Sequence, residues 1–356
     1  MAETAFATGS DQTVKLWSKK TWYEAQKGAL FFNKFLGTTE DSILYMQKDL
    51  EKTAGDNIVY DLLIEMEGEG VSGDNTLEGN EEALTFYQES LKIDQLRHAH
   101  IFGKMSQQRT VHNLRKDGQW ALSRWWSNKW EELLFRYLCG DTTVAHAGNS
   151  PTAPDANHHI YSGNATAETS TGALDSNDRF LLEDIDYAKE MATTASLPMR
   201  PVRIEGEDYF VVVLHPYSVT DLKLSLGTGA SSVKWHEIQQ YANIRGLKNP
   251  LFTGSLGVYN KCILFESHRI YSPSTNVRRN LFLGAQAGTF ALGNAYDKME
   301  QKKVGKDNYI SWVEQEQDYK NKKGLAAGAV FGMQKNVFNS EDFGVVTISS
   351  YAAKHT

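Results

Sequence analysis

Residues 57–66 read NIVYDLLIEM, and residues 84–96 read LTFYQESLKIDQL. In the first run, apolar side chains occupy every second position, on the face of Ile58, Tyr60, Leu62 and Ile64. The second run alternates less cleanly, with Tyr87, Leu91 and Ile93 on one side. A period of two predicts β-strands, and the two runs together indicate a long two-stranded ribbon. Such a ribbon is marginally stable alone in water, so we expect it to lie against another surface.

The segment between the two strands, residues 66–83, reads MEGEGVSGDNTLEGNEEA and contains no basic residue. Its six acids are Glu67, Glu69, Asp74, Glu78, Glu81 and Glu82. Four glycines disfavour a regular helix or strand here. A metal loop, a disordered spacer and an arm that contacts something outside its own domain are the three interpretations. The calcium-loop pattern does not fit, because neither its ligand positions nor its central glycine is reproduced.

The composition restricts the class of protein. The chain has 356 residues, 41% of them hydrophobic, which suffices for a sizeable core. A net charge of -7 argues against an overall basic face that wraps nucleic acid. Cys139 and Cys262 are far apart in sequence, which argues against a disulfide framework and favours reducing conditions. Neither a signal peptide nor an apolar run of about 20 residues is found, so we expect a soluble, cytosolic product.

A long helix is predicted over residues 106–138, within the stretch SQQRTVHNLRKDGQWALSRWWSNKWEELLFRYLCG. Its apolar stripe includes Val111, Leu114, Ala121, Leu122, Trp125, Leu133 and Tyr137, and Gly140 supplies a stop signal. At about 1.5 Å per residue, this helix would run on the order of 50 Å. We interpret Trp120, Trp125, Trp126, Trp130 and Leu133 as packing residues of the helix and not as a ligand cage.

The remaining predicted elements mix helices and strands. Helices are expected over residues 178–195 and 231–246, the first with Leu181, Leu182, Ile185, Ala188 and Ala192 inward. Residues 199–216 predict a hairpin that turns at 205–208 and enters a buried strand at 209–214. Further strands are predicted at 257–266, 280–292 and 343–351. This order indicates a mixed α+β fold without the βαβ rhythm of a doubly wound sheet.

No catalytic or metal-binding motif stands out. The glycine-rich run 225–234 matches neither the Walker spacing nor the dinucleotide fingerprint. His98 with His100, and His158 with His159, lack the partners of a zinc site. The small-residue run Gly324, Gly328 and Gly332 lies in too short an apolar context for a membrane helix. We therefore expect no cofactor, no metal and no enzymatic activity, although counting carboxylates does not exclude a glycosidase pair.

Four segments taken together resemble a known family. They are 74–99 (DNTLEGNEEALTFYQESLKIDQLRHA), 209–223 (YFVVVLHPYSVTDLK), 249–267 (NPLFTGSLGVYNKCILFES) and 281–293 (LFLGAQAGTFALG). They look like the N4-like major capsid proteins of tailed phages, typified by the short-tailed coliphage N4. The resemblance runs in order from about residue 55 to the C-terminus. It implies the Hong Kong 97-type (HK97-like) capsid fold.

The resemblance also implies a division of the chain. Residues 1–54 would be an N-terminal arm whose aromatic side chains are buried on adjacent subunits, and 55–103 an extended hairpin, the E-loop. Residues 104–175 would be the peripheral domain with its spine helix, and 176–335 the axial domain. Residues 336–356 would return to the peripheral domain. The six acids then lie at the E-loop tip, which crosses a neighbouring subunit.

The implied function is that of a major capsid protein. Copies of the chain would form hexamers and pentamers of an icosahedral head shell that encloses double-stranded DNA, contacted non-specifically on the inner face. The implied partners are the portal protein, a scaffolding protein and decoration proteins, without any membrane, and assembly would take place in the bacterial cytoplasm. Because the sequence shows no long charged helical leader, we expect scaffolding to come from a separate protein.

A further departure from the family and two alternatives accompany this interpretation. Some members of the fold crosslink a lysine to an asparagine, and Lys104 and Asn336 are candidates without a supporting local motif. The aromatic content and the many carboxylates leave a carbohydrate-active enzyme as an alternative. Another virion component, such as a tail or decoration protein, is the second.

Overall fold

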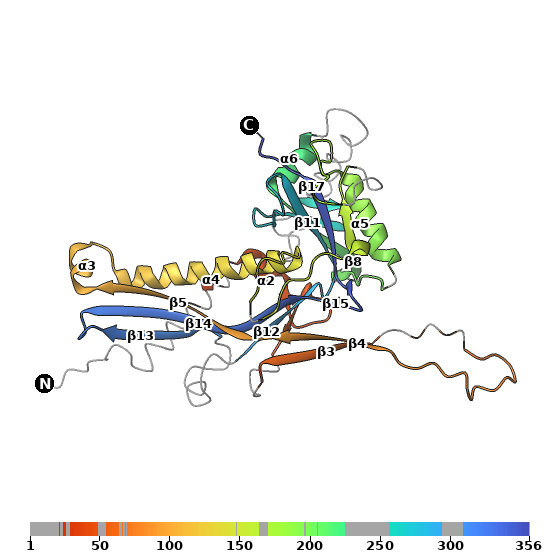
Figure 1. Ribbon diagram of the computed structural model, residues 1–356, viewed down its shortest axis with the longest axis horizontal. Helices are drawn as coiled ribbons and strands as arrows, with labels where there is room; N and C mark the ends of the chain where they lie inside the picture. Colours follow the sequence, from red (N-terminus) through yellow and green to blue (C-terminus); the bar gives the residue numbers. More distant parts are fainter. Residues whose placement is uncertain are drawn as a thin grey trace.

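A computed structural model describes the protein at residues 21, 24–25, 29–48, 55–63, 66, 68, 70–146, 148–163, 170–195, 197–204, 206–224, 256–293 and 309–355. Two β-sheets organise these residues, and Figure 1 shows how they lie. One sheet and the long helix α4 form an elongated arm. The other sheet forms an upright body with two helices, and a two-stranded ribbon extends away from the arm.

The arm is built on a six-stranded sheet in the order β1-β2-β12-β14-β13, with β5 also paired to β14. The strands are β1 (Leu36–Gly37), β2 (Leu44–Gln47), β5 (Asp94–Gly103), β12 (Gly288–Leu292), β13 (Ser311–Gln317) and β14 (Lys322–Lys335). β14 is the axis of this sheet, because β5 lies along one side while β13 and β12 share the other. The sequence analysis did not predict β13 or β14.

The predicted long helix is interrupted. The structure has a short helix α3 (Lys104–Arg109), a break, and then α4 (Leu114–Leu138) with Asn113 as its N-cap. The Asn113 side chain accepts a hydrogen bond from the backbone N–H of Lys116, which satisfies a donor that a helix start leaves unpaired. Val111 lies in the break and is fully exposed, so it does not belong to the apolar stripe. The predicted helix end, before Gly140, is confirmed.

The upright body is built on a seven-stranded sheet in the order β6-β17-β11-β8-β10-β9, with β7 also paired to β8. Its strands are β6 (His159–Tyr161), β7 (Val202–Ile204), β8 (Glu207–Leu214), β9 (Gly257–Tyr259), β10 (Cys262–Glu266), β11 (Val277–Leu283) and β17 (Val345–Tyr351). Its helices are α5 (Leu182–Thr194) and α6 (Pro216–Leu224), and a short turn of 3₁₀ helix, η2 (Ala156–His158), precedes β6. The hairpin of β7 and β8 and the buried strand within β8 were predicted and are confirmed.

The strand pairing divides the second half of the chain between the two sheets. Residues 336–356, which the resemblance assigns to the peripheral domain, include β17, and this strand pairs with β11 and β6 in the seven-stranded sheet. The predicted strand 280–292 divides into β11 of the body and β12 of the arm. Strands that follow one another in the sequence therefore lie in different sheets, because β12, β14 and β17 each pair with strands from earlier in the chain. The predicted helix 231–246 lies outside the described residues.

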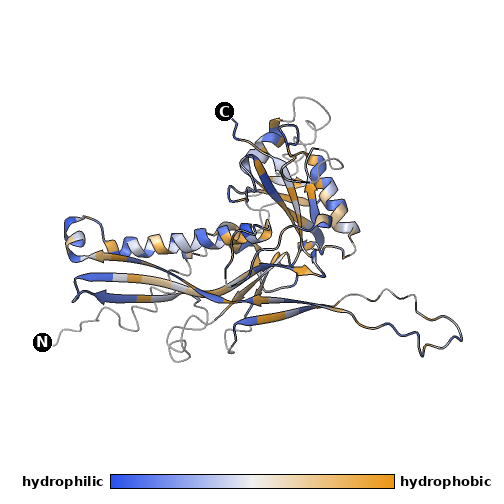
Figure 2. Cartoon of the chain, viewed as in Figure 1, coloured by the Kyte–Doolittle hydropathy of each residue, from blue (hydrophilic) through white to orange (hydrophobic). Residues whose placement is uncertain are grey.

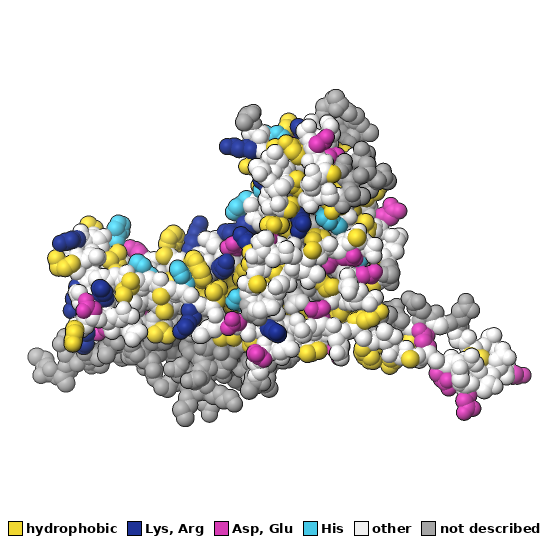
Figure 3. Space-filling model, viewed as in Figure 1, with side chains coloured by type: hydrophobic (Ala, Val, Ile, Leu, Met, Phe, Trp, Pro, Cys, Tyr) yellow, Lys and Arg dark blue, Asp and Glu magenta, His cyan; other side chains and the backbone are white. Residues whose placement is uncertain are grey.

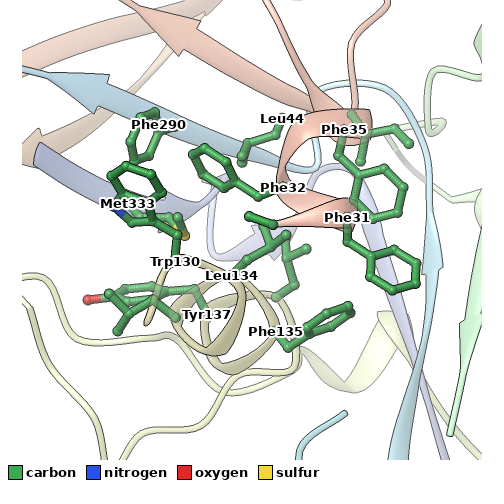
Figure 4. Close-up of a cluster of buried hydrophobic side chains, with 14 of the residues drawn as sticks. Phe31, Phe32, Phe35, Leu44, Trp130, Leu134, Phe135, Tyr137, Phe290 and Met333 are labelled. Carbon is green, nitrogen blue, oxygen red and sulfur yellow. The ribbon is translucent and has the colours of Figure 1, made fainter. Parts of the chain in front are cut away.

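The N-terminal segment also differs from expectation. Phe31, Phe32 and Phe35 of α2 (Leu30–Phe35) are buried in the chain's own core and not reserved for a neighbour. Figure 4 shows α2 against α4, and the ring of Phe32 stacks on Trp130 at 5.6 Å between centroids. The buried carboxylate of Glu131 holds the segment, since it accepts a hydrogen bond from the Phe31 N–H at 3.1 Å and pairs with Arg269 at 3.1 Å. Trp17, Trp22 and Tyr23 lie outside the described residues.

The glycine run of β14 has a packing reason. A Cβ atom on Gly332 would collide with the backbone carbonyl oxygen of Lys92, where the chain passes from the ribbon into the arm. Strand β14 therefore needs glycine at this crossing so that two backbones can approach closely.

We expect Gly332→Ala to destabilise the unassembled chain by about 1–3 kcal/mol, because the crossing backbones must separate. Urea unfolding of the purified chain measures this change. Gly324→Ala is the matched control, because the nearest atom to its added Cβ is the Gln315 carbonyl oxygen at 3.6 Å, an ordinary contact. Equal stability of the two variants would contradict the close approach at Gly332.

Candidate assembly interface

The base of the ribbon is fastened to the rest of the chain by apolar contacts. Strands β3 (Asn57–Leu63) and β4 (Phe86–Lys92) pair antiparallel, with Asn57 opposite Lys92 and Leu63 opposite Phe86. On the inward face, Ile58 and Leu91 pack with Ala291 of the arm. Further along, Leu62 packs with Phe338 and Phe343, on the short hairpin of β15 (Val337–Phe338) and β16 (Glu341–Asp342) and just after it. The predicted ribbon and its inward face are confirmed at Ile58, Tyr60 and Leu62, while Ile64 lies outside the described residues.

Polar contacts hold the same inward face. The hydroxyl of Tyr60 donates to the side-chain oxygen of Asn336 at 3.0 Å, and Gln334 donates to the carboxylate of Glu89 at 2.6 Å. Burial raises the pKa of the Glu89 carboxyl. These hydrogen bonds fix the direction in which the ribbon extends from the arm.

The side chain of Asn149 clamps the start of the ribbon. Its amide oxygen accepts from the Lys92 N–H at 3.0 Å, and its amide nitrogen donates to the Lys92 carbonyl at 2.7 Å. The side-chain amide of Asn149 thus makes the two hydrogen bonds to Lys92 that the backbone of a neighbouring strand would otherwise make. The sequence analysis did not identify it, because nothing local marks an asparagine in a loop as a strand partner.

The outward face of the ribbon carries unpartnered apolar side chains. Val59, Leu63 and Phe86 are 57%, 50% and 54% exposed, and Leu63 and Phe86 lie directly opposite each other across the two strands. Met66, Leu77 and Leu84 in the connecting loop are 59%, 61% and 56% exposed. Figure 2 shows hydrophobic residues along both strands where they leave the body. The polar pair of Asp61 and Gln88 separates Val59 from Leu63 and Phe86 on this face. Exposed apolar side chains at the end of the ribbon and in its loop are candidates for an interaction site.

The acidic loop extends beyond the ribbon without regular secondary structure over residues 70–85. Asp74, Glu78, Glu81 and Glu82 are exposed on it, while Glu67 and Glu69 lie outside the described residues. Two of the acids shape the loop from within. Glu82 accepts from the Gly68 N–H at 2.8 Å, and Glu81 from the Gly79 N–H at 2.7 Å. The loop is therefore an acidic projection beyond the main body.

The tryptophans of α4 divide into three kinds. Trp126 and Trp130 are fully buried, and Leu133 is 1% exposed. Trp125 is half-buried and stacks on His98 of β5 at 4.3 Å. Trp120 is 61% exposed, with the guanidinium of Arg124 over its ring at 5.7 Å, so the expectation that it packs in the core is wrong for this chain. Trp120 falls on the side of α4 that faces away from the sheet.

Lys19, Lys20, Arg115 and Lys116 are the basic residues that we considered as counter-charges for the acidic tip of a neighbouring copy. Arg115 already binds Glu314 of β13, with three contacts of 2.8–3.1 Å, and Glu314 also accepts from the Trp312 indole at 3.0 Å. Lys116 is exposed, and Lys19 and Lys20 lie outside the described residues. The crosslink candidate Asn336 is buried, and it accepts from Tyr60 and Thr289 and donates to Gln286. Asn336 thus has a structural role within the chain.

The described residues contain neither a helix of transmembrane type nor a cluster of metal ligands. None of their helices is long and apolar enough to cross a membrane. No group of three or more His, Cys, Asp or Glu side chains in this part of the chain is arranged to hold a metal ion. Both cysteines are buried, and burial raises the pKa of each thiol to about 12.

A profile of the phage capsid protein family matches residues 5–354. The chain belongs to this family. The capsid protein is 31% identical to the major capsid protein of Pseudomonas phage KPP25, over 97% of its own length and 96% of that protein's. As a phage capsid component, it is a virion protein.

Solved structures agree with the capsid assignment. The capsid of Ralstonia phage GP4 superposes with a TM-score of 0.78 at 30% identity, and 92% of each chain is covered. The capsid subunit of cyanophage Pam1 gives a TM-score of 0.71 at 19% identity over both full chains, a likeness that concerns the fold. The capsid protein therefore has the mixed α+β, HK97-like fold that the sequence resemblance implied.

Proposed function

We propose that this capsid protein is the major subunit of the phage head and that its copies assemble as hexamers and pentamers. The observation that carries the proposal is the ribbon, whose inward face packs on its own chain while its outward face exposes Val59, Leu63 and Phe86. A ribbon that is fixed on one face and exposes apolar side chains on the other is suited to pack on a neighbouring copy. Head-to-tail contacts of this type close into rings, and rings of six and five tile a closed shell.

The parts of the chain receive roles in this proposal. The ribbon with its loop is the E-loop, the arm with α4 is the peripheral domain, and the body with the seven-stranded sheet is the axial domain around the ring axis. The net charge of -7 suits a wall that faces packaged double-stranded DNA, since a basic lining would bind phosphate strongly. Portal, scaffolding and decoration proteins are the proposed partners, and assembly takes place in the host cytoplasm. This structural role requires no catalysis.

The experiment introduces charge on the outward face of the ribbon. Leu63→Asp with Phe86→Asp is expected to abolish shell and ring formation, because two carboxylates would have to be buried at the contact. Both side chains are exposed in the single chain, so the free energy of unfolding should stay within about 0.5 kcal/mol of the parent. Negative-stain imaging and sedimentation measure assembly, and urea unfolding measures stability.

Conservative changes at the same positions are the control. Leu63→Ile with Phe86→Tyr keeps the apolar surface and should assemble normally. Normal shell yield from the Asp variant would overturn the role of the ribbon. Failure of the parent chain to form rings or shells, alone or with a scaffolding protein, would overturn the proposed function itself.

A further inference from the structure

A cavity of about 480 Å³ opens at the end of the arm that lies farthest from the acidic loop, between α3 and the turn that joins β13 to β14. Its lining residues come from β5, α3, β13, β14 and the turn between the last two, and all but one have polar or charged side chains whose apolar stems also line the cavity: Phe102, Lys104, Gln107, Gln108, Glu316, Lys320, Asn321 and Lys323. None of these side chains belongs to the ribbon.

The cavity carries an excess of positive charge. Of its four charged side chains, three are lysines and one is Glu316. Glu316 is shared, at 4.0 Å from the Lys320 ammonium and 3.6 Å from that of Lys323, while Lys104 has no ion-pair partner among the described residues. One carboxylate therefore faces three ammonium groups, in a chain whose net charge is -7. A ligand with an acidic side chain fits this surface.

The cavity wall is held in place by the backbone. Asp318, Tyr319 and Lys320 all have left-handed φ angles of 53°, 49° and 69°, and the Asn321 N–H closes the turn on the Asp318 carbonyl at 2.8 Å. The Asn321 carbonyl in turn accepts from the Lys104 N–H at 3.0 Å, which ties α3 to the turn. The turn and α3, which position Lys320 and Lys104, are therefore held together by backbone hydrogen bonds.

The acidic loop offers a complementary surface. Leu77 is 61% exposed at its outer part, and Glu78 follows it directly. Unlike Glu81 and Glu82, the Glu78 carboxylate makes no hydrogen bond within the described part of the chain. An apolar side chain next to an uncommitted carboxylate matches a cavity that has Phe102 and three lysines in its lining.

The loop and the cavity lie at opposite ends of the long axis (Figure 1), so one molecule cannot bring them together. Figure 3 shows acidic side chains at the loop end and Lys and Arg side chains at the arm end. A second copy placed head to tail supplies the missing partner.

We propose that the cavity at the end of the arm receives Leu77 and Glu78 of the acidic loop from a second copy of this chain. Leu77 contacts Phe102, and the Glu78 carboxylate pairs with Lys320 and Lys323. This docking rests on the proposed assembly into a shell and names the surface to which the loop binds. Opposite charges at such a contact favour the correct partner and its orientation.

A charge exchange tests the proposal. Glu78→Lys alone, and Lys320→Glu with Lys323→Glu, are each expected to raise the protein concentration needed for assembly about tenfold, equivalent to about 1.4 kcal/mol per contact. The two sets of changes combined should restore most of the assembly, because the pair is re-formed with reversed sign. Raising the salt concentration should reduce the difference between parent and variants. Light scattering during assembly, with negative-stain imaging of the products, measures these effects.

Lys116→Glu is the matched control, an exposed lysine on α4 outside the cavity that should leave assembly unchanged. If Lys116→Glu impairs assembly and the cavity variants do not, the loop docks on α4 and the proposal is wrong. Normal assembly of all the single-site variants also overturns the docking, while leaving the proposed shell function intact. Failure of the charge-exchanged chain to recover assembly, with unfolding free energies equal to the parent, excludes a direct pair.

Discussion

Lys335→Met is expected to lower the free energy of unfolding by about 3–5 kcal/mol, because it leaves a buried carboxylate without its counter-charge. The Lys335 ammonium lies 2.6 Å from the Asp342 carboxylate, and the two side chains are 0% and 1% exposed. Burial lowers the pKa of Lys335 and raises that of Asp342, so each charged form depends on the other. Methionine keeps the apolar stem of the lysine and removes only the charge.

The double variant separates the charge from the packing. Lys335→Met combined with Asp342→Leu should recover most of the lost stability, since an apolar pair of similar volume carries no desolvation cost. Urea unfolding of the unassembled chain measures all three proteins. A loss below about 1 kcal/mol for the single change would show that water reaches Asp342 when the lysine is removed.

Trp130→Ala is expected to cost about 3–5 kcal/mol, as a large-to-small change at a fully buried position. Its ring contacts Phe32 of α2 and lies 5.4 Å from Trp126, so the change also loosens the N-terminal segment. Increased proteolysis within residues 29–48 should accompany the lower unfolding free energy.

Trp120→Ala is the control for this change. Because Trp120 is 61% exposed and contacts Arg124, its replacement should alter stability by about 0.5 kcal/mol or less. Equal losses for the two variants would mean that α4 is rotated relative to the sheet. A larger loss of unfolding free energy for Trp120→Ala than for Trp130→Ala would show that the opposite face of the helix is buried.

Several elements followed from local sequence patterns. The alternation of Ile58, Tyr60 and Leu62 predicted the ribbon and its inward face. Because side chains alternate between the two faces of a strand, every second residue must be apolar where one face is buried. The apolar spacing in residues 178–195 predicted α5, whose Ile185, Ala188 and Ala192 are buried. The acidic projection was also visible in the sequence, because six acids without a base are a local feature.

The burial of α4 was only partly predictable. Four polar residues one turn apart, Gln119, Ser123, Ser127 and Glu131, are buried on it. They are buried because the helix is covered by the N-terminal segment as well as by the sheet: Ser123 reaches Glu24, and Glu131 reaches Phe31. A pattern search that follows only large apolar residues misses this second cover. It assigned Trp120 and Val111 to a buried face for the same reason.

The sites formed by distant residues were not predictable at all. The cavity lysines come from residues 104 and 320–323, which meet only because β5 and β14 pair over ten positions. The Asn149 clamp on Lys92 likewise joins residues far apart in sequence. The buried Lys335–Asp342 pair is closer in sequence, but it forms only because the chain turns back through β15 and β16. Nothing in the neighbouring sequence distinguishes these side chains from surface residues.

The position of β17 has a consequence for the order in which the protein is made. It is the last strand of the described residues, yet it lies between β6 and β11, which precede it by more than sixty residues. The first of these strands therefore has no partner in the sheet until residue 345 has left the ribosome. The seven-stranded sheet is therefore complete only after β17 has been synthesised, and a nascent chain that lacks β17 would hold an open sheet edge of the kind that draws proteins into aggregates. Insertion of β17 between β6 and β11 is thus the step that joins β6 to the rest of the sheet.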